Sequence, residues 1–170
     1  MGERPRVNNS LDNKRILVVD DEPDVLETIT EVLDMCHVET AADFKKAEKL
    51  LKTNNYDMVI LDIMGVSGLH LIDVAVERNV LAVMLTAPAF NPEYLLKSME
   101  RGAISCFPKE DIAELDSLLD DLCQVIENGG QPWHHTMKRI EPLLDERFSP
   151  SWKKRYKKLR DATVEHAKKS

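Results

Sequence analysis

The sequence predicts an α/β protein in which a five-stranded parallel sheet is covered by helices on both faces and is followed by a helical extension. Between residues 14 and 128, short apolar runs alternate five times with stretches of helical periodicity, a pattern that is typical of a doubly wound sheet. The first, third and fourth runs are almost continuously apolar, as parallel strands buried on both faces are. Unusual polar residues follow these runs, at the strand ends where open α/β sheets bind ligands.

The apolar runs and the helical periods give the expected element boundaries. The strands are expected at 15–20, 37–41, 56–62, 80–86 and 103–107. The helices are expected at about 23–35, 43–53, 68–77, 91–101 and 110–127. Helix start signals agree with two boundaries, because Asp43 can cap the second helix, and Asn91 with Pro92 supplies a cap and a first-turn proline to the fourth.

The chain is expected to have three parts: a flexible arm at 1–13, the α/β domain at 14–128 and a helical extension at 129–170. The second boundary rests on ENGGQPW at 127–133, the only Gly/Pro cluster in the sequence. In the extension we expect a helix near 133–147, which Pro142 should break or kink, and a second helix from 149 to about 168.

The composition is that of a soluble globular protein, with 43% hydrophobic and 31% charged residues. No apolar run approaches the roughly 18 residues needed to cross a bilayer. The first residues also lack the apolar stretch of a secretory signal. Three unclustered cysteines, Cys36, Cys106 and Cys123, indicate reduced thiols, so that a cytoplasmic location is expected.

The extension is basic from residue 149 onward, with eight Lys or Arg against two acidic residues, whereas the whole chain has a net charge of −7. Apolar or weakly polar residues recur there at helical spacing, namely Trp152, Tyr156, Leu159, Thr163 and His166. We expect this stripe to pack against the acidic domain, or to mediate a homodimer or the binding of an effector protein. DNA binding is not expected, because the remaining chain carries a negative field.

Polar side chains stand at the carboxyl ends of four expected strands: Asp20 and Asp21 after the first, Asp62 after the third, Thr86 at the fourth and Lys109 just beyond the fifth. If these strands lie side by side, the five side chains share one crevice. The three carboxylates provide hard oxygen ligands for Mg²⁺, which would offset their mutual repulsion. An aspartate held in this way can act as a nucleophile and form an aspartyl-phosphate, with Thr86 and Lys109 contacting the phosphoryl oxygens.

Each of these residues also has a purely structural interpretation. Adjacent aspartates after a strand often cap a helix or compensate its dipole, and Asp62 at a strand end can start a turn. Thr86 suits any strand and Lys109 any surface. The ordered set at four strand ends nevertheless favours a site.

Four segments, ILVVDDEPDVL, DMVILDIM, VMLTA and RGAISCFPKE, together resemble the receiver domain of response regulators in two-component signalling, over about residues 14–128. The resemblance implies the flavodoxin-like (βα)5 receiver fold. By position, it implies that Asp62 is the phosphoacceptor, that Asp21 is a direct Mg²⁺ ligand, that Asp20 acts mainly through water, and that the Met64 carbonyl is the third protein ligand.

The same resemblance implies that Thr86 is the switch hydroxyl and Lys109 the lysine of the family pattern. The sequence departs from that pattern at three places. The loop DIMGVSG after Asp62 reaches its glycine about two residues early, Pro108 precedes the lysine instead of following it, and the position of the switch aromatic holds Cys106. Because side chains alternate along a strand, Cys106 and Phe107 should face opposite sides of the sheet.

The resemblance implies a phosphoacceptor that takes a phosphoryl group from a sensor histidine kinase and changes conformation to signal. It also implies that the domain catalyses its own phosphorylation and dephosphorylation, with no turnover of an external substrate. The alternative is a non-phosphorylated pseudo-receiver that acts as a protein-interaction module; the presence of all five polar residues argues against it. A hydrolase of the haloacid-dehalogenase class would need a second aspartate two positions after the nucleophile, where Met64 stands.

Overall fold

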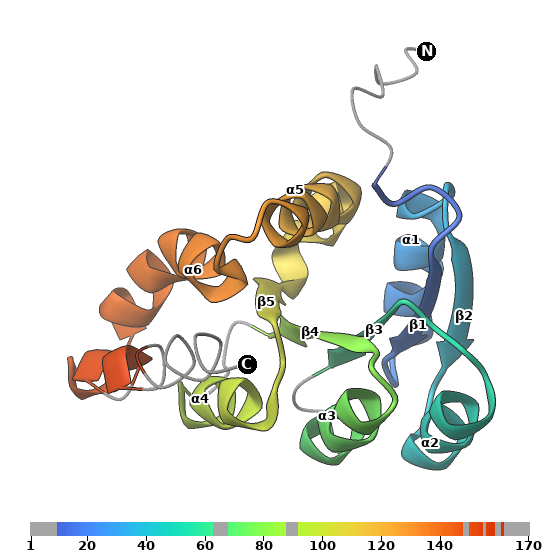
Figure 1. The fold of residues 1–170 in the computed structure, drawn as a ribbon, viewed down its shortest axis with the longest axis horizontal. Coiled ribbons are helices and arrows are strands. Elements are labelled where there is room, and N and C mark those ends of the chain that lie inside the picture. Colours follow the sequence, from blue (N-terminus) through green and yellow to red (C-terminus); the bar gives the residue numbers. More distant parts are fainter. Residues whose placement is uncertain are drawn as a thin grey trace.

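A computed structural model describes residues 10–62, 68–87, 92–147, 150–154, 156–158 and 161. Its centre is a parallel five-stranded sheet with the strand order β2-β1-β3-β4-β5. Helices cover both faces of this sheet, and the C-terminal helices lie beyond β5 (Figure 1). The predicted doubly wound α/β fold with a helical extension is therefore confirmed.

The observed elements follow the predicted order. The strands are β1 (Arg15–Val19), β2 (His37–Ala41), β3 (Met58–Asp62), β4 (Leu81–Thr86) and β5 (Ser105–Pro108). The helices are α1 (Pro23–Val32), α2 (Phe44–Thr53), α3 (Gly68–Glu77), α4 (Pro92–Arg101), the 3₁₀ helix η1 (Lys109–Glu114), α5 (Leu115–Glu127) and α6 (Pro132–Arg147).

Two helix boundaries differ from the prediction by more than one residue. Helix α1 ends at Val32, three residues before the predicted end, and the helix predicted from residue 110 starts with the 3₁₀ turn η1. The cap predicted at Asp43 is confirmed, because its Oδ1 accepts a hydrogen bond of 2.8 Å from the Lys46 amide. Asn91, the other predicted cap, lies outside the described residues.

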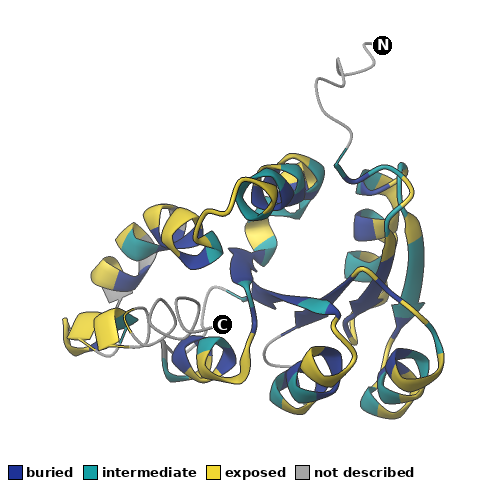
Figure 2. Ribbon diagram, in the orientation of Figure 1, coloured by how far each residue is buried: buried dark blue, intermediate teal, exposed yellow. Residues whose placement is uncertain are grey.

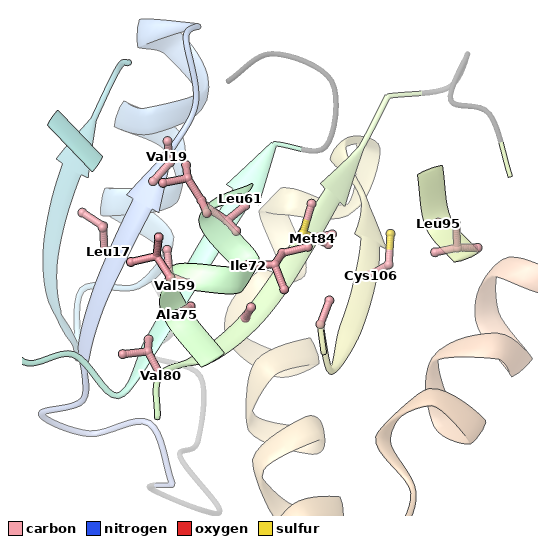
Figure 3. Close-up of a cluster of buried hydrophobic side chains, with 14 of the residues drawn as sticks. Leu17, Val19, Val59, Leu61, Ile72, Ala75, Val80, Met84, Leu95 and Cys106 are labelled. Atoms are coloured by element: carbon pink, nitrogen blue, oxygen red, sulfur yellow. The ribbon is translucent and has the colours of Figure 1, made fainter. Parts of the chain in front are cut away.

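Alternating residues of the strands pack into two separate cores, one on each face of the sheet. Ile16 and Val18 of β1 belong to the core covered by α1 and α5. Leu17 and Val19 belong to the other core, which α2, α3, α4 and α6 cover (Figure 3). The sheet is buried throughout most of its length, whereas the helices expose their outer sides (Figure 2). This double burial explains why the central strands are almost continuously apolar.

Helix α6 is part of the second core. Its buried residues Trp133, Met137, Ile140 and Leu144 recur at helical spacing and join the cluster of β4, β5 and α4. The break predicted at Pro142 does not occur, since α6 continues through it to Arg147. The predicted break was wrong because burial of the residues on either side of the proline offsets the loss of one backbone hydrogen bond. A kink at Pro142 stays a prediction.

The segment after α6 begins with helical residues at 151–154 and 156–158. Trp152 is only 5% exposed and Tyr156 packs partly buried against the same core, so the predicted packing of the stripe on the domain is confirmed for these two residues. Leu159, Thr163 and His166 lie outside the described residues. At the other end, Leu11, which was assigned to the arm, is buried in the core under α1 and α5. Among the described helices, none has the length and apolar character to cross a membrane.

Candidate functional site: an acidic cluster at the ends of β1 and β3

The sheet order brings the carboxyl ends of β1 and β3 together. Val19 of β1 is in register with Leu61 of β3, so Asp20 and Asp62 follow at the same level of the sheet. One carboxylate oxygen from each of Asp20, Asp21 and Asp62 lies within 4.8 Å of the other two. Asp20 and Asp62 are buried and Asp21 is exposed. Two of the three carboxylates are thus buried at the carboxyl end of the sheet, and the third is exposed to solvent.

Lys109, the first residue after β5, reaches into this cluster. Its Nζ lies 3.0 Å from Asp20 Oδ2 and 3.1 Å from Asp62 Oδ2. The same ammonium lies 3.2 Å from Oε1 of Glu22, a residue that was not predicted to belong to the site. The only sequence signal for Glu22 was its place in the acidic run after β1, because nothing local shows that a lysine 87 residues away faces it.

One ammonium therefore balances several carboxylates. Burial raises the pKa of the Asp20 carboxyl above its usual value, although the Glu22 amide, which donates a 2.9 Å hydrogen bond to Asp20 Oδ1, and the Lys109 ammonium both oppose this rise. Partial burial lowers the pKa of Lys109, but its contacts with the Asp20 and Asp62 carboxylates outweigh this effect and raise that pKa overall. The charged form of the lysine is thus held firmly at the centre of the cluster.

The donor set fits a small divalent cation. Asp20 Oδ2 is buried and accepts no hydrogen bond from the residues that the structure describes, although the Lys109 ammonium lies 3.0 Å from it. A buried carboxylate oxygen with spare acceptor capacity, beside two further carboxylates, is the chemistry that Mg²⁺ selects. Met64, the backbone ligand implied by the family resemblance, lies outside the described residues.

Thr86 stands at the next strand end. Asp62 is in register with Leu85 of β4, which places the buried Thr86 one residue beyond it. Thr86 also makes a hydrogen bond with the thiol of Cys106 on β5. Burial raises the pKa of that thiol to about 12, and the bond to Thr86 lowers it only in part.

Cys106 belongs to the core with α4 and α6, whereas Phe107 belongs to the core with α1 and α5. The prediction that these two residues face opposite sides of the sheet is therefore confirmed. Phe107 accordingly does not occupy the place of Cys106 beside Thr86.

Comparisons with known proteins agree with this geometry. The family model "Response regulator receiver domain" matches residues 16–120, more than half of the chain. Two-component response regulator ARR18 of Arabidopsis thaliana is 27% identical over 132 residues, which cover 74% of this chain and 18% of ARR18. Two-component response regulator ARR12 of the same plant is 33% identical over 96 residues, covering 52% of this chain and 16% of ARR12. The chain thus spans less than a fifth of the length of these relatives.

Among solved structures, the crystal structure of a CheY-like response regulator receiver domain protein from Methanospirillum hungatei JF-1 superposes with a TM-score of 0.62 at 21% identity. The superposition covers 70% of this chain and all of that one, and it shows a shared fold. The family model, the strand order and the acidic pocket lead to the same conclusion: this chain belongs to the response-regulator receiver-domain family.

Proposed function

We propose that this protein accepts a phosphoryl group on Asp62 from a sensor histidine kinase. The observation that carries the proposal is the arrangement around Asp62, with two further carboxylates within 4.8 Å and the Lys109 ammonium 3.1 Å from its Oδ2. A carboxylate in contact with an ammonium, beside the ligands for a divalent cation, is arranged for nucleophilic attack on phosphorus.

The transfer forms one bond and breaks one. A carboxylate oxygen of Asp62 attacks phosphorus, the P–N bond to the kinase histidine breaks, and the imidazole nitrogen retains the electron pair and takes a proton. Asp20, Asp21 and Asp62, with the carbonyl of Met64, would hold Mg²⁺, which would neutralise charge on the phosphoryl oxygens. Lys109 and the Thr86 hydroxyl each donate a hydrogen bond to a phosphoryl oxygen.

Apart from the phosphodonor, we expect no turnover of an external substrate. The nucleophile, the ammonium and the hydroxyl all belong to one strand-end site, so the domain is equipped to catalyse its own phosphorylation and the later hydrolysis. We place the protein in the cytoplasm, where sensor kinases present their phosphohistidine and where its three cysteines, all free thiols, stay reduced.

The first prediction tests the phosphoacceptor. Incubation with acetyl phosphate and Mg²⁺ should add a single phosphoryl group, measured by intact mass, and omission of Mg²⁺ should prevent it. Asp62→Asn should abolish the addition, because the amide is not a nucleophile. Asp57→Asn is the matched control, since Asp57 is an exposed aspartate that immediately precedes the amino end of β3.

A full mass shift in Asp62→Asn would refute the assignment of the acceptor. Absence of a shift in the unmodified protein, with both acetyl phosphate and a phosphorylated kinase, would favour the alternative of a pseudo-receiver that only binds partners.

A further inference from the structure

Helix α6 is seated on the strand that leads into the acidic site. It lies beside β5, the last strand of the sheet (Figure 1). Four of its side chains, Trp133, Met137, Ile140 and Leu144, are buried in the same core as Cys106 of β5. An edge strand has unpaired backbone groups along its outer side. The apolar face of α6 packs against this edge of β5.

Two buried hydrogen bonds fix the position of α6. The Trp133 indole Nε1 donates to the carbonyl of Ala103 at 2.6 Å, just before β5 begins. The hydroxyls of Ser105 and Thr136 form a second hydrogen bond, and both residues are almost completely buried. Because a buried polar group without its partner costs far more than the bond itself contributes, these two bonds define one register of α6 on β5.

The same strand therefore carries two contacts at its two ends. Ser105, the partner of α6, is the first residue of β5, and Lys109 follows its last residue, Pro108. We call the contact of α6 with β5 through Trp133 and Thr136 the α6 seat. Only three residues lie between Ser105 of this seat and Lys109, whose ammonium contacts Asp20, Asp62 and Glu22. A short strand in a packed sheet moves as a unit, so a shift of Lys109 is transmitted to Ser105.

We propose that α6 is the element that reads the phosphorylation state of Asp62, an inference that rests on the proposed function. Phosphorylation replaces the single negative charge of the carboxylate with a phosphoryl group that carries about −1.5 to −2 charges. Lys109 then turns toward the phosphoryl oxygens and leaves its present contacts with Asp20 and Glu22, which draws β5 along its axis. Hydrogen bonds weaken steeply with misalignment, so the Trp133 and Thr136 contacts loosen and α6 detaches from the edge of β5.

Coupling of this kind is reciprocal. If phosphorylation weakens the α6 seat, a weaker α6 seat must favour the phosphorylated form by the same factor. The proposal can therefore be tested from both ends, with the full chain in each case.

The first test starts from phosphorylation and uses tryptophan fluorescence as the probe. The two tryptophans of the chain, Trp133 and Trp152, are both buried in the core that α6 covers. Acetyl phosphate with Mg²⁺ should increase the quenching of tryptophan fluorescence by acrylamide, in proportion to the phosphorylated fraction seen by intact mass. Asp62→Asn should show neither change. A complete mass shift with unchanged quenching would overturn the present inference alone, whereas no mass shift would overturn the proposed function and this inference with it.

From the α6 end, Thr136→Val removes one hydroxyl and keeps the side-chain shape. Beryllofluoride with Mg²⁺ serves as the phosphoryl mimic, with its affinity measured by calorimetry. We expect Thr136→Val to bind it about fivefold more tightly than the unmodified protein, since the lost hydrogen bond stabilises only the unphosphorylated form. Ser105→Ala removes the same bond from the β5 side and should act in the same direction.

Thr53→Val is the matched control. The Thr53 hydroxyl bonds to the Lys49 carbonyl within α2, far from β5, and its residue is exposed. Its beryllofluoride affinity should equal that of the unmodified protein. Equal or weaker affinity in both Thr136→Val and Ser105→Ala would overturn the role of α6.

Discussion

The acidic cluster and the α6 seat, meaning the contact of α6 with β5 through Trp133 and Thr136, are built on opposite principles. In the cluster, several carboxylates face one ammonium, so like charges remain close together without full compensation. In the α6 seat, apolar side chains surround two hydrogen bonds that satisfy their groups. The repulsion in the cluster costs stability but places a carboxylate next to other charged groups. The α6 seat stabilises the fold and holds β5, from which Lys109 extends, in place.

The largest expected effect is on the stabilising side of this comparison. Trp133→Ala should lower the free energy of unfolding by about 3–5 kcal/mol, the range for truncating a buried aromatic side chain. It also leaves the Ala103 carbonyl without its donor. Trp133→Phe keeps an aromatic ring and loses the N–H group, so its loss should be smaller, about 1–2 kcal/mol. Urea unfolding followed by circular dichroism measures both.

Equal losses in the two Trp133 variants would show that the hydrogen bond, and not the apolar contact, stabilises the seat. A loss below about 1 kcal/mol in Trp133→Ala would mean that α6 does not pack on β5 in solution, and would remove the contrast between the two regions.

The second effect concerns the acidic cluster. Asp21→Ala should weaken Mg²⁺ binding by more than about 100-fold, because we expect Asp21 to be a direct ligand, whereas Asp20→Ala, acting through water, should weaken it about tenfold. Asp20 is also the carboxylate that Lys109 contacts at 3.0 Å, so part of its role is to hold the lysine. Calorimetric titration of Mg²⁺ distinguishes the two variants.

Asp21→Ala should in addition leave the metal-free protein at least as stable as the unmodified one, because it removes one of several like charges. If the two aspartate variants lose Mg²⁺ affinity equally, the ranking of the ligands is wrong.

The smallest effect uses two thiols, Cys106 within β5 and Cys36 just before β2. Cys106 on β5 is completely buried, whereas Cys36, which directly precedes β2 and donates its thiol hydrogen to the Leu11 carbonyl at 3.3 Å, is half-buried. Burial raises the pKa of Cys36 from an ordinary value of 9.0 to about 11 and that of Cys106 to about 12. Since only the thiolate reacts, alkylation of Cys36 by iodoacetamide should be slow at neutral pH and accelerate about tenfold per pH unit until pH approaches 11.

Cys106 should react only after the fold opens, so peptide mapping after brief alkylation at pH 9 should find Cys36 labelled and Cys106 protected. Labelling of Cys106 at the same rate would show that the buried thiol on β5 is no better protected than the half-buried thiol of Cys36. The raised pKa also has a consequence for stability. The folded state keeps the Cys36 proton between pH 9 and 11 while the unfolded state releases it, so this residue contributes to a loss of stability as the pH rises through that range.

The sequence by itself determined the alternation of strands and helices and the acidic composition of the site. Apolar periodicity is a local property, and it placed Asp20, Asp62 and Lys109 at strand ends that a parallel sheet must align. The cap at Asp43 was also readable, since its partner lies three residues away. Each of these predictions depends on residues that are close together in the sequence.

Only the tertiary structure decided what depends on contacts between distant segments. The Glu22–Lys109 pair, the Ser105–Thr136 bond and the burial of Leu11 join residues that no local pattern connects. Pro142 shows the same limit from the other direction, because a local rule predicted a break that packing against the core overrode. The apolar face of an amphipathic helix must be covered, but the free energy gained by burying that face is nearly the same against any apolar surface. Which strand α6 covers is therefore set by the shape and hydrogen-bonding groups that β5 presents.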